Sequence, residues 1–196
     1  MTPAPDGRPF VSRAGEKLDA ALRAFAIDVA GLVCTDLGSH VGGFVDCLLA
    51  RGAARVHAVD PGYGLLAPAL RADPRVIVHE RTNALRAEFT ERADLVTIDA
   101  GWTPQRLILP AADRALAPRG RVITLVKPQY ECPKSWLRRG VLPAERMAEA
   151  LETCAQDAID CGWAIRARLE SPLPGHGGNV EHLWLLERGG SAASLL

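Results

Sequence analysis

The chain of 196 residues carries 23 basic and 23 acidic side chains, so its formal net charge at pH 7 is zero, and 48% of its residues are apolar. A chain of this length and apolar content can bury one sizeable core, which predicts a single domain. The neutral balance excludes a protein that attracts nucleic acid through bulk charge, so any basic surface must be local.

Cysteine usage and hydropathy indicate the cellular setting. The five cysteines are scattered and include no C-x-x-C pair, which favours reduced thiols over a disulfide framework or a zinc site. No stretch approaches the roughly 18 apolar residues of a membrane-spanning helix, and the first residues carry no apolar signal segment. We therefore expect a cytoplasmic protein without a metal site or a membrane segment, and the oligomeric state stays open.

The chain begins with a Pro-rich stretch, residues 1–9, that predicts a flexible lead-in. A helical pattern follows from Ser12 to Phe25, with Ser12 suited to the N-cap position. Lys17 lies between the apolar positions of this helix. Taken alone, a lysine in that place indicates a solvent-facing edge.

The next segment, Val33 to Asp60, has the pattern of a nucleotide-binding βαβ unit. An apolar strand, Val33 to Leu37, runs into a glycine turn, a helical run and a second strand that ends in Asp60. Glycines at a strand end let a ligand approach the backbone, and the helix beginning near Gly42 directs free N–H groups toward it. The segment therefore predicts a cofactor-binding edge.

The spacing of the turn indicates which cofactor binds. A dinucleotide fold requires a glycine where this chain has His40, because pyrophosphate lies against bare backbone there. The chain retains Asp36 before the turn, a loose glycine turn from Gly38, and Asp60 about 20 residues later, where a carboxylate holds a ribose diol. These features favour a nucleoside without a pyrophosphate, S-adenosylmethionine.

Two further strands end at the same edge. A strand at 76–78 exits toward Asn83, which suits either a nucleobase contact or an ordinary turn. A continuously apolar strand from Asp94 ends in Asp99, and such a run is typical of a strand buried on both faces. Because the carboxyl ends of parallel strands meet at one edge, Asp99 is placed for chemistry; capping of the next helix is the alternative.

The following elements bring a lysine to that edge. A helix at 105–116 precedes a strand at 121–126, which ends in Lys127, and a lysine at the end of a buried strand is uncommon. The loop at 132–140 mixes cations with Trp136. Such a mixture suits phosphates and an unstacked base, or a solvated loop.

The last elements reverse the chain direction. A helix at 143–160 leads to a strand at 163–169, and a final strand covers 180–186. The link between these two strands is too short for a helical crossover, so the final strand is antiparallel and begins near Lys127 with Glu181. The sequence therefore predicts an α/β, Rossmann-like fold with a mostly parallel seven-stranded sheet, an antiparallel last strand and helices on both faces.

Four ionisable groups then face one pocket: Lys17, Asp99, Lys127 and Glu181. Methyl transfer from a sulfonium needs an in-line nucleophile, and a ribose hydroxyl becomes one only when a base removes its proton. Lys127 suits the base if burial or the neighbouring Lys17 lowers its pKa, whereas the two carboxylates orient the amines and oppose that lowering. The sequence leaves this balance open.

Eight ordered blocks of the chain resemble the FtsJ-type ribose 2′-O-methyltransferases, and most closely their TlyA group, also labelled haemolysin A. The blocks are 12–18, 36–39 with 42–44, 59–60 with 62–64, 73–76, 80–83, 94–99, 127–131 and 178–181. The resemblance runs from Phe10 to Arg188. It implies a class I methyltransferase domain over residues 10–188, and we expect a flexible tail over 189–196.

The resemblance also implies an activity and its residues. The activity is methylation of a ribose 2′-hydroxyl in ribosomal RNA, with S-adenosylmethionine as the cofactor. The family's catalytic tetrad falls on Lys17, Asp99, Lys127 and Glu181. The implied cofactor contacts are Asp36, Gly38, Ser39, Gly42, Gly43, Asp60, Asn83 and Asp99. For RNA the chain offers Arg13, Trp102, Lys134, Trp136, Arg138 and Arg139.

Two departures from that family bear on the substrate. TlyA chains carry an N-terminal S4-type RNA-binding domain that this sequence lacks, so we expect RNA capture by the catalytic body, by the loop from Lys134 to Arg139, or by a partner. The residues after Asp99 also differ from the expected Ser-Phe-Ile-like run. The alternative is a methyltransferase of a small molecule or short RNA, or a non-catalytic S-adenosylmethionine-binding protein. Pore formation finds no membrane-crossing segment in the sequence to support it.

Overall fold

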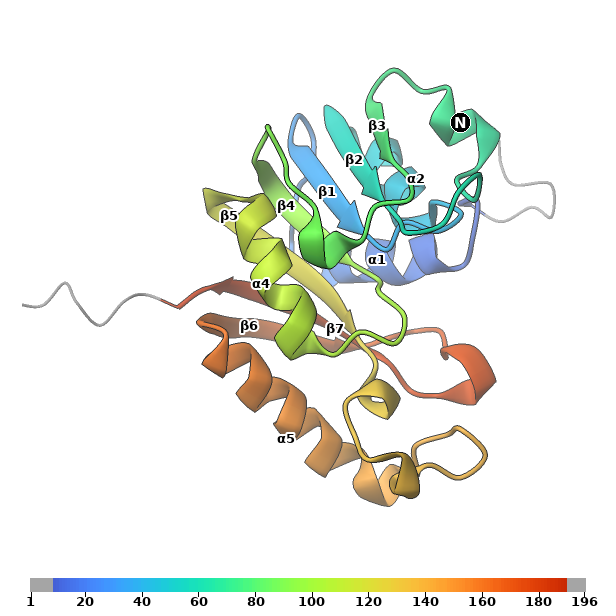
Figure 1. Cartoon of the computed structure of the whole chain (residues 1–196), viewed down its shortest axis with the longest axis vertical. Coiled ribbons are helices and arrows are strands. Elements are labelled where there is room, and N and C mark those ends of the chain that lie inside the picture. The colour runs from blue at the N-terminus through green and yellow to red at the C-terminus, as the bar shows by residue number, and fades with distance from the viewer. Residues whose placement is uncertain (1–8, 190–196) are drawn as a thin grey trace, which may run out of the picture.

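The computed structural model describes residues 9–189 and arranges them as one seven-stranded sheet with helices on both faces (Figure 1). The strand order is β3-β2-β1-β4-β5-β7-β6, in which β7 runs antiparallel to both neighbours and the other pairs are parallel. The strands are β1 (Val33–Leu37), β2 (Arg55–Val59), β3 (Val76–His79), β4 (Ala93–Ile98), β5 (Leu116–Val126), β6 (Trp163–Glu170) and β7 (His182–Arg188). The predicted Rossmann-like α/β fold is confirmed.

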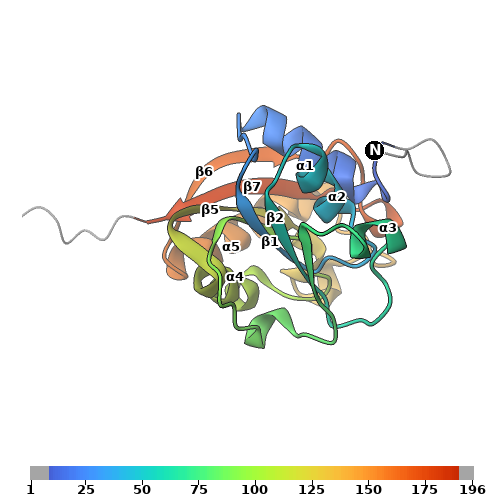
Figure 2. The ribbon, with the colours of Figure 1, turned by 90° about the horizontal axis from the view of Figure 1, so that it is seen from above.

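Two helical layers enclose the sheet. One layer holds α1 and α2 and the other holds α4 and α5, as the view along the sheet shows (Figure 2). The α-helices are α1 (Ala14–Ala24), α2 (Gly43–Ala50), α3 (Pro68–Arg71), α4 (Gln105–Ala115) and α5 (Ala144–Asp160). Four short 3₁₀ turns join them: η1 (Ala84–Arg86), η2 (Pro128–Tyr130), η3 (Lys134–Trp136) and η4 (His176–Gly178).

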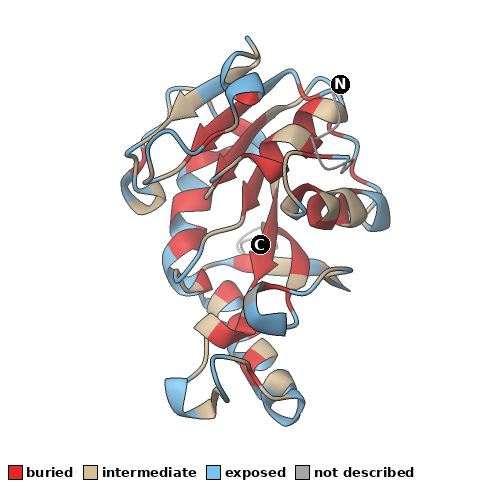
Figure 3. Ribbon diagram, turned by 90° about the vertical axis from the view of Figure 1, so that its right-hand side faces the viewer, coloured by how far each residue is buried: buried red, intermediate tan, exposed pale blue. Residues whose placement is uncertain are grey.

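The central strands are apolar on both sides because each side packs against a helical layer. In β4, Leu95 packs into the core beneath α1 and α2, whereas Val96 packs into the core beneath α4 and α5. In β5, Ile123 packs beneath α1 and α2, and Val122 packs beneath α4 and α5. The buried residues therefore concentrate along the middle of the sheet (Figure 3), which fixes the strand ends rigidly.

Several predicted boundaries differ from the structure. The prediction that Ser12 caps the first helix is wrong, because α1 begins at Ala14 and Arg13 occupies the N-cap. β5 begins at Leu116 rather than at residue 121, since Leu116 already pairs with Ala93 before the register shifts. The final strand begins two residues later than expected, which leaves Glu181 just before it.

The predicted flexible lead-in and tail fall almost entirely on residues 1–8 and 190–196, which lie outside the described residues. Within residues 9–189, none of the helices is long and apolar enough to cross a membrane.

The turn between β1 and α2 depends on Gly42. This residue has a φ of 99° and forms the N-cap of α2. A Cβ added there would lie 2.3 Å from Cδ1 of Leu70 and 2.8 Å from Cδ1 of Leu66. Gly42 is therefore required both for its backbone conformation and for close packing of α3.

We expect Gly42→Ala to lower the free energy of unfolding by about 2–4 kcal/mol, because backbone strain adds to overpacking. Gly64→Ala is the matched control: Gly64 also has a positive φ, 69°, but no atom lies within 4 Å of an added Cβ. It should cost only about 1 kcal/mol. Urea unfolding of both variants measures the difference, and equal losses would contradict the packing role.

Candidate functional site

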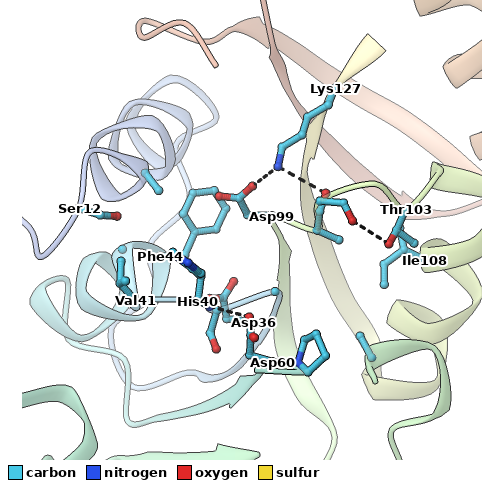
Figure 4. Close-up of a pocket in the computed structure, with 18 of the residues that line it drawn as sticks. Ser12, Asp36, His40, Val41, Phe44, Asp60, Asp99, Thr103, Ile108 and Lys127 are labelled. Atoms are coloured by element: carbon cyan, nitrogen blue, oxygen red, sulfur yellow. Dashed lines mark hydrogen bonds and ion pairs between the residues drawn. The ribbon is translucent and has the colours of Figure 1, made fainter. Parts of the chain in front are cut away.

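A cavity of about 670 Å³ opens at the carboxyl ends of β1, β2, β4 and β5 (Figure 4). This edge is where open α/β sheets bind ligands, and the volume lies in the range of small-molecule sites. Its wall includes residues from the β1 turn, the strand ends and the first turns of α1. The predicted edge therefore carries a real cavity.

The turn after β1 is held against the neighbouring strands by backbone hydrogen bonds. The amides of Gly38 and Ser39 both donate to the carbonyl of Val59. Gly38 has a φ of 94°, and a Cβ there would lie 2.6 Å from the carbonyl oxygen of Asp99. The turn thus needs glycine at this point so that β1 and β4 can end close together.

Asp60 ends β2 with its carboxylate directed into the turn (Figure 4). One carboxylate oxygen accepts from the amide of His40 at 2.8 Å and the other from the amide of Gly62 at 2.7 Å. These two bonds fix the carboxylate while leaving each oxygen further acceptor capacity. The geometry suits an acceptor for a pair of hydroxyl groups.

Asp36 is fully buried in β1 on the wall of the cavity. Its Oδ1 accepts from Oγ1 of Thr97 at 2.7 Å, whereas its Oδ2 has no hydrogen-bond partner in the part of the chain that the structure describes. Burial raises the pKa of Asp36 to about 8, and the nearby charges of Asp99 and Asp60 add to the rise. A buried acceptor without a partner fits a cationic or N–H group of a ligand.

Two ion pairs bring the four predicted tetrad residues to one wall. Nζ of Lys17 lies 2.5 Å from Oε2 of Glu181, and both side chains are buried. Nζ of Lys127 lies 2.6 Å from Oδ1 of Asp99, at the ends of β5 and β4 (Figure 4). The interpretation of Lys17 as a solvent-facing side chain is therefore wrong, because its partner comes from the far end of the chain.

The charge balance at Lys127 favours its protonated form. Burial alone would lower the pKa of Lys127, but the attraction and hydrogen bond of Asp99, together with the more distant Glu181, outweigh it and raise the pKa above its ordinary value. The sequence left this balance open, and here the carboxylates outweigh burial, while Lys17 forms an ion pair with Glu181.

The reversed final strand explains how Glu181 reaches the site. Glu181 directly precedes β7, which runs antiparallel to β5 and so starts where β5 ends. Just before it, the side chain of Asn179 accepts from the amide of Leu142 at 2.9 Å and donates to the carbonyl of Gly140 at 3.0 Å. These bonds anchor the segment that carries Glu181.

The remaining predicted contacts divide into two groups. Arg13, Gly38, Ser39, Gly43 and Asn83 line the cavity. Gly42, Trp102, Lys134, Trp136, Arg138 and Arg139 are absent from its wall.

Four residues of the second group have another environment. Gly42 packs against α3, as described above. Trp136 lies beneath the guanidinium of Arg146 at 4.7 Å, and Arg138 forms an exposed ion pair with Glu145. The basic loop is therefore directed partly to α5 rather than to the cavity. Trp102 is 80% exposed at the cavity rim and stacks on Tyr130, with 4.7 Å between the ring centroids.

Sequence reasoning did not select three residues that the structure brings to the site. Tyr130 lines the cavity, Asn179 anchors the Glu181 segment, and Glu131 binds the first amide of α4 at 2.9 Å. All three lie within the blocks that carry the family resemblance, which was the available signal. Within residues 9–189, no group of three or more His, Cys, Asp or Glu side chains is arranged to hold a metal ion.

The sequence of the chain is similar to a family of methyltransferases and to curated members of it. A model of the FtsJ-like methyltransferase family matches residues 10–188. The chain is 45% identical over 184 residues to the 16S/23S rRNA (cytidine-2'-O)-methyltransferase TlyA of Mycobacterium tuberculosis, covering 91% of this chain and 69% of that relative.

Two solved structures are similar over most of the chain. One is described as a hemolysin from Streptococcus thermophilus, with a TM-score of 0.90, 37% identity, and coverage of 93% of this chain and 68% of that one. The other, described as a hemolysin from Lactococcus lactis, has a TM-score of 0.86, 35% identity, and coverage of 90% and 88%.

The raised pKa of Asp36 makes stability depend on pH. Its pKa is about 8 in the folded chain and near 3.8 when unfolded, so its contribution to stability is full below about pH 4 and is lost as the pH rises through 8. Asp36→Asn removes this loss. We therefore compare the free energy of unfolding of the variant with that of the wild type. This difference should shift in favour of the variant by more than about 1 kcal/mol when the pH is raised from 5 to 8.5.

Urea unfolding at these two pH values measures the gain. Glu152→Gln, on an exposed position of α5, is the control and should show no such pH-dependent gain. The same gain in both variants would show that Asp36 is not the titrating group.

Proposed function

The chain belongs to the FtsJ-like methyltransferase family, and we propose that it transfers a methyl group from S-adenosylmethionine to a ribose 2′-hydroxyl of ribosomal RNA. The observation that carries the proposal is the pair of ion pairs on one cavity wall, Lys17 with Glu181 and Lys127 with Asp99. The names of the relatives, such as rRNA (cytidine-2'-O)-methyltransferase, support ribosomal RNA as the substrate.

The residues of the cavity fit S-adenosylmethionine. Asp60 offers two fixed acceptors to a ribose diol, and the unpartnered buried oxygen of Asp36 suits an ammonium group. Asn83 is at the wall, but its side-chain oxygen already accepts from the amide of Leu85. When bound, the cofactor supplies an electrophilic methyl group on a sulfonium.

The base that activates the ribose hydroxyl is Lys127 in this proposal. A neutral Nζ would accept the proton of the 2′-hydroxyl while the oxygen takes the methyl group and the sulfur–methyl bond of the cofactor breaks, which leaves a neutral thioether. Asp99 would stabilise the ammonium that results. Because the pKa of Lys127 is raised, the neutral form is scarce at neutral pH. Turnover should therefore increase with pH up to that pKa.

Lys17 and Glu181 orient the acceptor in this proposal. Both are buried, and each satisfies the charge of the other, so they present a fixed polar surface beside Lys127. Removing one would leave an uncompensated buried charge, which is costly.

The rim of the cavity offers contacts for RNA. Trp102 and Tyr130 form a stacked pair beside Lys127, and an exposed aromatic ring suits an unstacked base. Arg13, at the N-cap of α1, also lines the cavity and is exposed. Lys134, Arg138 and Arg139 lie farther out, where they suit phosphates beyond the target nucleotide.

The test supplies the protein with tritiated S-adenosylmethionine and RNA, either as naked ribosomal RNA or as ribosomal subunits. Label that resists alkaline cleavage at one ribose is the expected result and identifies the target. Absence of label on every RNA, with cofactor binding intact, would instead support a small acceptor or a non-catalytic role.

We expect Lys127→Ala to reduce turnover by about 10³-fold or more, because the variant removes the proposed general base. The dissociation constant for S-adenosylmethionine, measured by calorimetry, should change by less than about threefold, since Lys127 serves the acceptor. A parallel loss of cofactor binding would contradict this role.

Asp60→Ala should act on the cofactor. Loss of the fixed acceptor pair should weaken binding of S-adenosylmethionine by about 1–3 kcal/mol. Calorimetric titration measures the change, and Asp28→Ala, at an exposed position outside the cavity wall, is the control. Unchanged affinity in Asp60→Ala would remove this residue from the binding site.

A further inference from the structure

Besides the hydrogen bond from Nζ of Lys127 to the carbonyl oxygen of Ala100 at 3.4 Å, three contacts join the loop that carries Asp99 to the loop that carries Lys127. The first is the ion pair between these two residues, and the second is the stack of Trp102 on Tyr130. The third lies deeper: Oε1 of Glu131 accepts from the amide of Gln105 at 2.9 Å. The first two contacts use groups on the wall or rim of the cavity, whereas Glu131 is absent from that wall.

Gln105 is the first residue of α4 and so ends the loop that follows Asp99. Its N-cap residue, Pro104, has no side-chain group to cap the helix. Glu131 supplies that cap from the other loop, and a carboxylate at a helix N-terminus is well placed for both the free amide and the helix dipole. The side chain of Gln105 in turn accepts from Oγ1 of Thr124 in β5.

Trp102 shows why this loop needs a fixed end. Its φ of 57° is a left-handed conformation that a bulky residue adopts only when its surroundings impose it. The loop is short, so the position of its last residue controls where Asp99 and Trp102 lie relative to Lys127. Glu131 fixes that last residue from the same loop that carries Lys127.

We propose that Glu131 is a positioning residue of the methyl transfer reaction, which holds the loop of Asp99 and Trp102 in register with Lys127 by capping α4. The proposal rests on the proposed function and assigns to Glu131 no contact with substrate or cofactor.

The surroundings of Glu131 give the proposal a pH signature. Burial raises the pKa of Glu131 to about 7, with Asp157 of α5 adding to the rise and the Gln105 hydrogen bond and Arg106 of α4 opposing it. The thiols of Cys132 and Cys154 are the other titratable groups near it, and burial raises the pKa of both. The pKa of Glu131 therefore lies near neutral pH.

The test compares Glu131→Ala with Glu131→Gln under conditions where the wild type methylates RNA. Glu131→Ala should lower kcat by roughly 10- to 100-fold through misalignment, with the dissociation constant for S-adenosylmethionine changed less than about threefold. Glu131→Gln keeps an acceptor for the Gln105 amide and should restore kcat to within about threefold of the wild type, since a neutral acceptor is roughly half as strong. Asp157→Asn, which removes the adjacent acid but not the cap, is the matched control and should keep wild-type kcat.

The pH profile separates alignment from general destabilisation. The ratio of wild-type kcat to Glu131→Gln kcat should fall from about three toward one between pH 8 and pH 6, as the wild-type carboxyl becomes neutral. The titration of Lys127 is common to both proteins and cancels in the ratio. Urea unfolding confirms that each variant is folded at the assay temperature.

A wild-type kcat in Glu131→Ala, or a Glu131→Gln variant as slow as Glu131→Ala while both stay folded, would overturn the proposal. A wild type that methylates no RNA would instead overturn the proposed function, so the two failures are distinguishable.

Discussion

The structure depends on the pairing of two lysines, the buried Lys17 and the half-buried Lys127, with two carboxylates. Moving a charged group out of water is costly, and the cost is offset only when an opposite charge and further hydrogen bonds meet it in good geometry. Lys17 and Glu181 are both less than 7% exposed and come from opposite ends of the described chain. The fold must therefore bring α1 and the start of β7 to the ends of β4 and β5 before either lysine can be buried.

The sheet topology meets this requirement. β4 and β5 run parallel and end together, which places Asp99 beside Lys127. A further parallel strand would deliver its first residue to the opposite edge, but β7 is antiparallel to β5, so the residue before it arrives at the same edge. The reversal of the final strand is thus part of the site, and the short link from β6 that forces it has a functional consequence.

Much of this arrangement could be predicted from the sequence, because it follows from strand direction. Three of the four charged groups are placed by local sequence signals. Asp99 follows an apolar strand, Lys127 follows β5, and Glu181 follows the short link that reverses the chain. The burial of Lys17 could not be predicted from its helix alone, since the carboxylate that pairs with it is 164 residues away. From the sequence, Lys17 is placed beside Lys127 as a neighbouring cation, and the family resemblance implies its membership of the tetrad.

Three of the predicted contact residues have packing partners outside the cavity. Gly42 lies against α3, Trp136 lies beneath the guanidinium of Arg146, and Arg138 forms an exposed ion pair with Glu145 of α5. Glu131 is the opposite case. Nothing in the sequence distinguishes it from other acidic residues, but in the structure it accepts a hydrogen bond from the first amide of α4. The type of a residue shows which groups it can bind. The tertiary contacts determine which of its hydrogen-bonding and packing groups remain available to a ligand.

The charge state of the cavity links its stability to its ligand. Asp36 is fully buried, and one of its oxygens has no partner among the described residues. Burial raises its pKa to about 8, so this carboxyl is mostly protonated at neutral pH in the folded chain. A ligand that places a cation beside that oxygen favours the ionised form, and linkage requires that ionisation favour the ligand equally. A cationic ligand beside Asp36 would therefore lower the raised pKa of this acid, and its binding would release a proton at neutral pH.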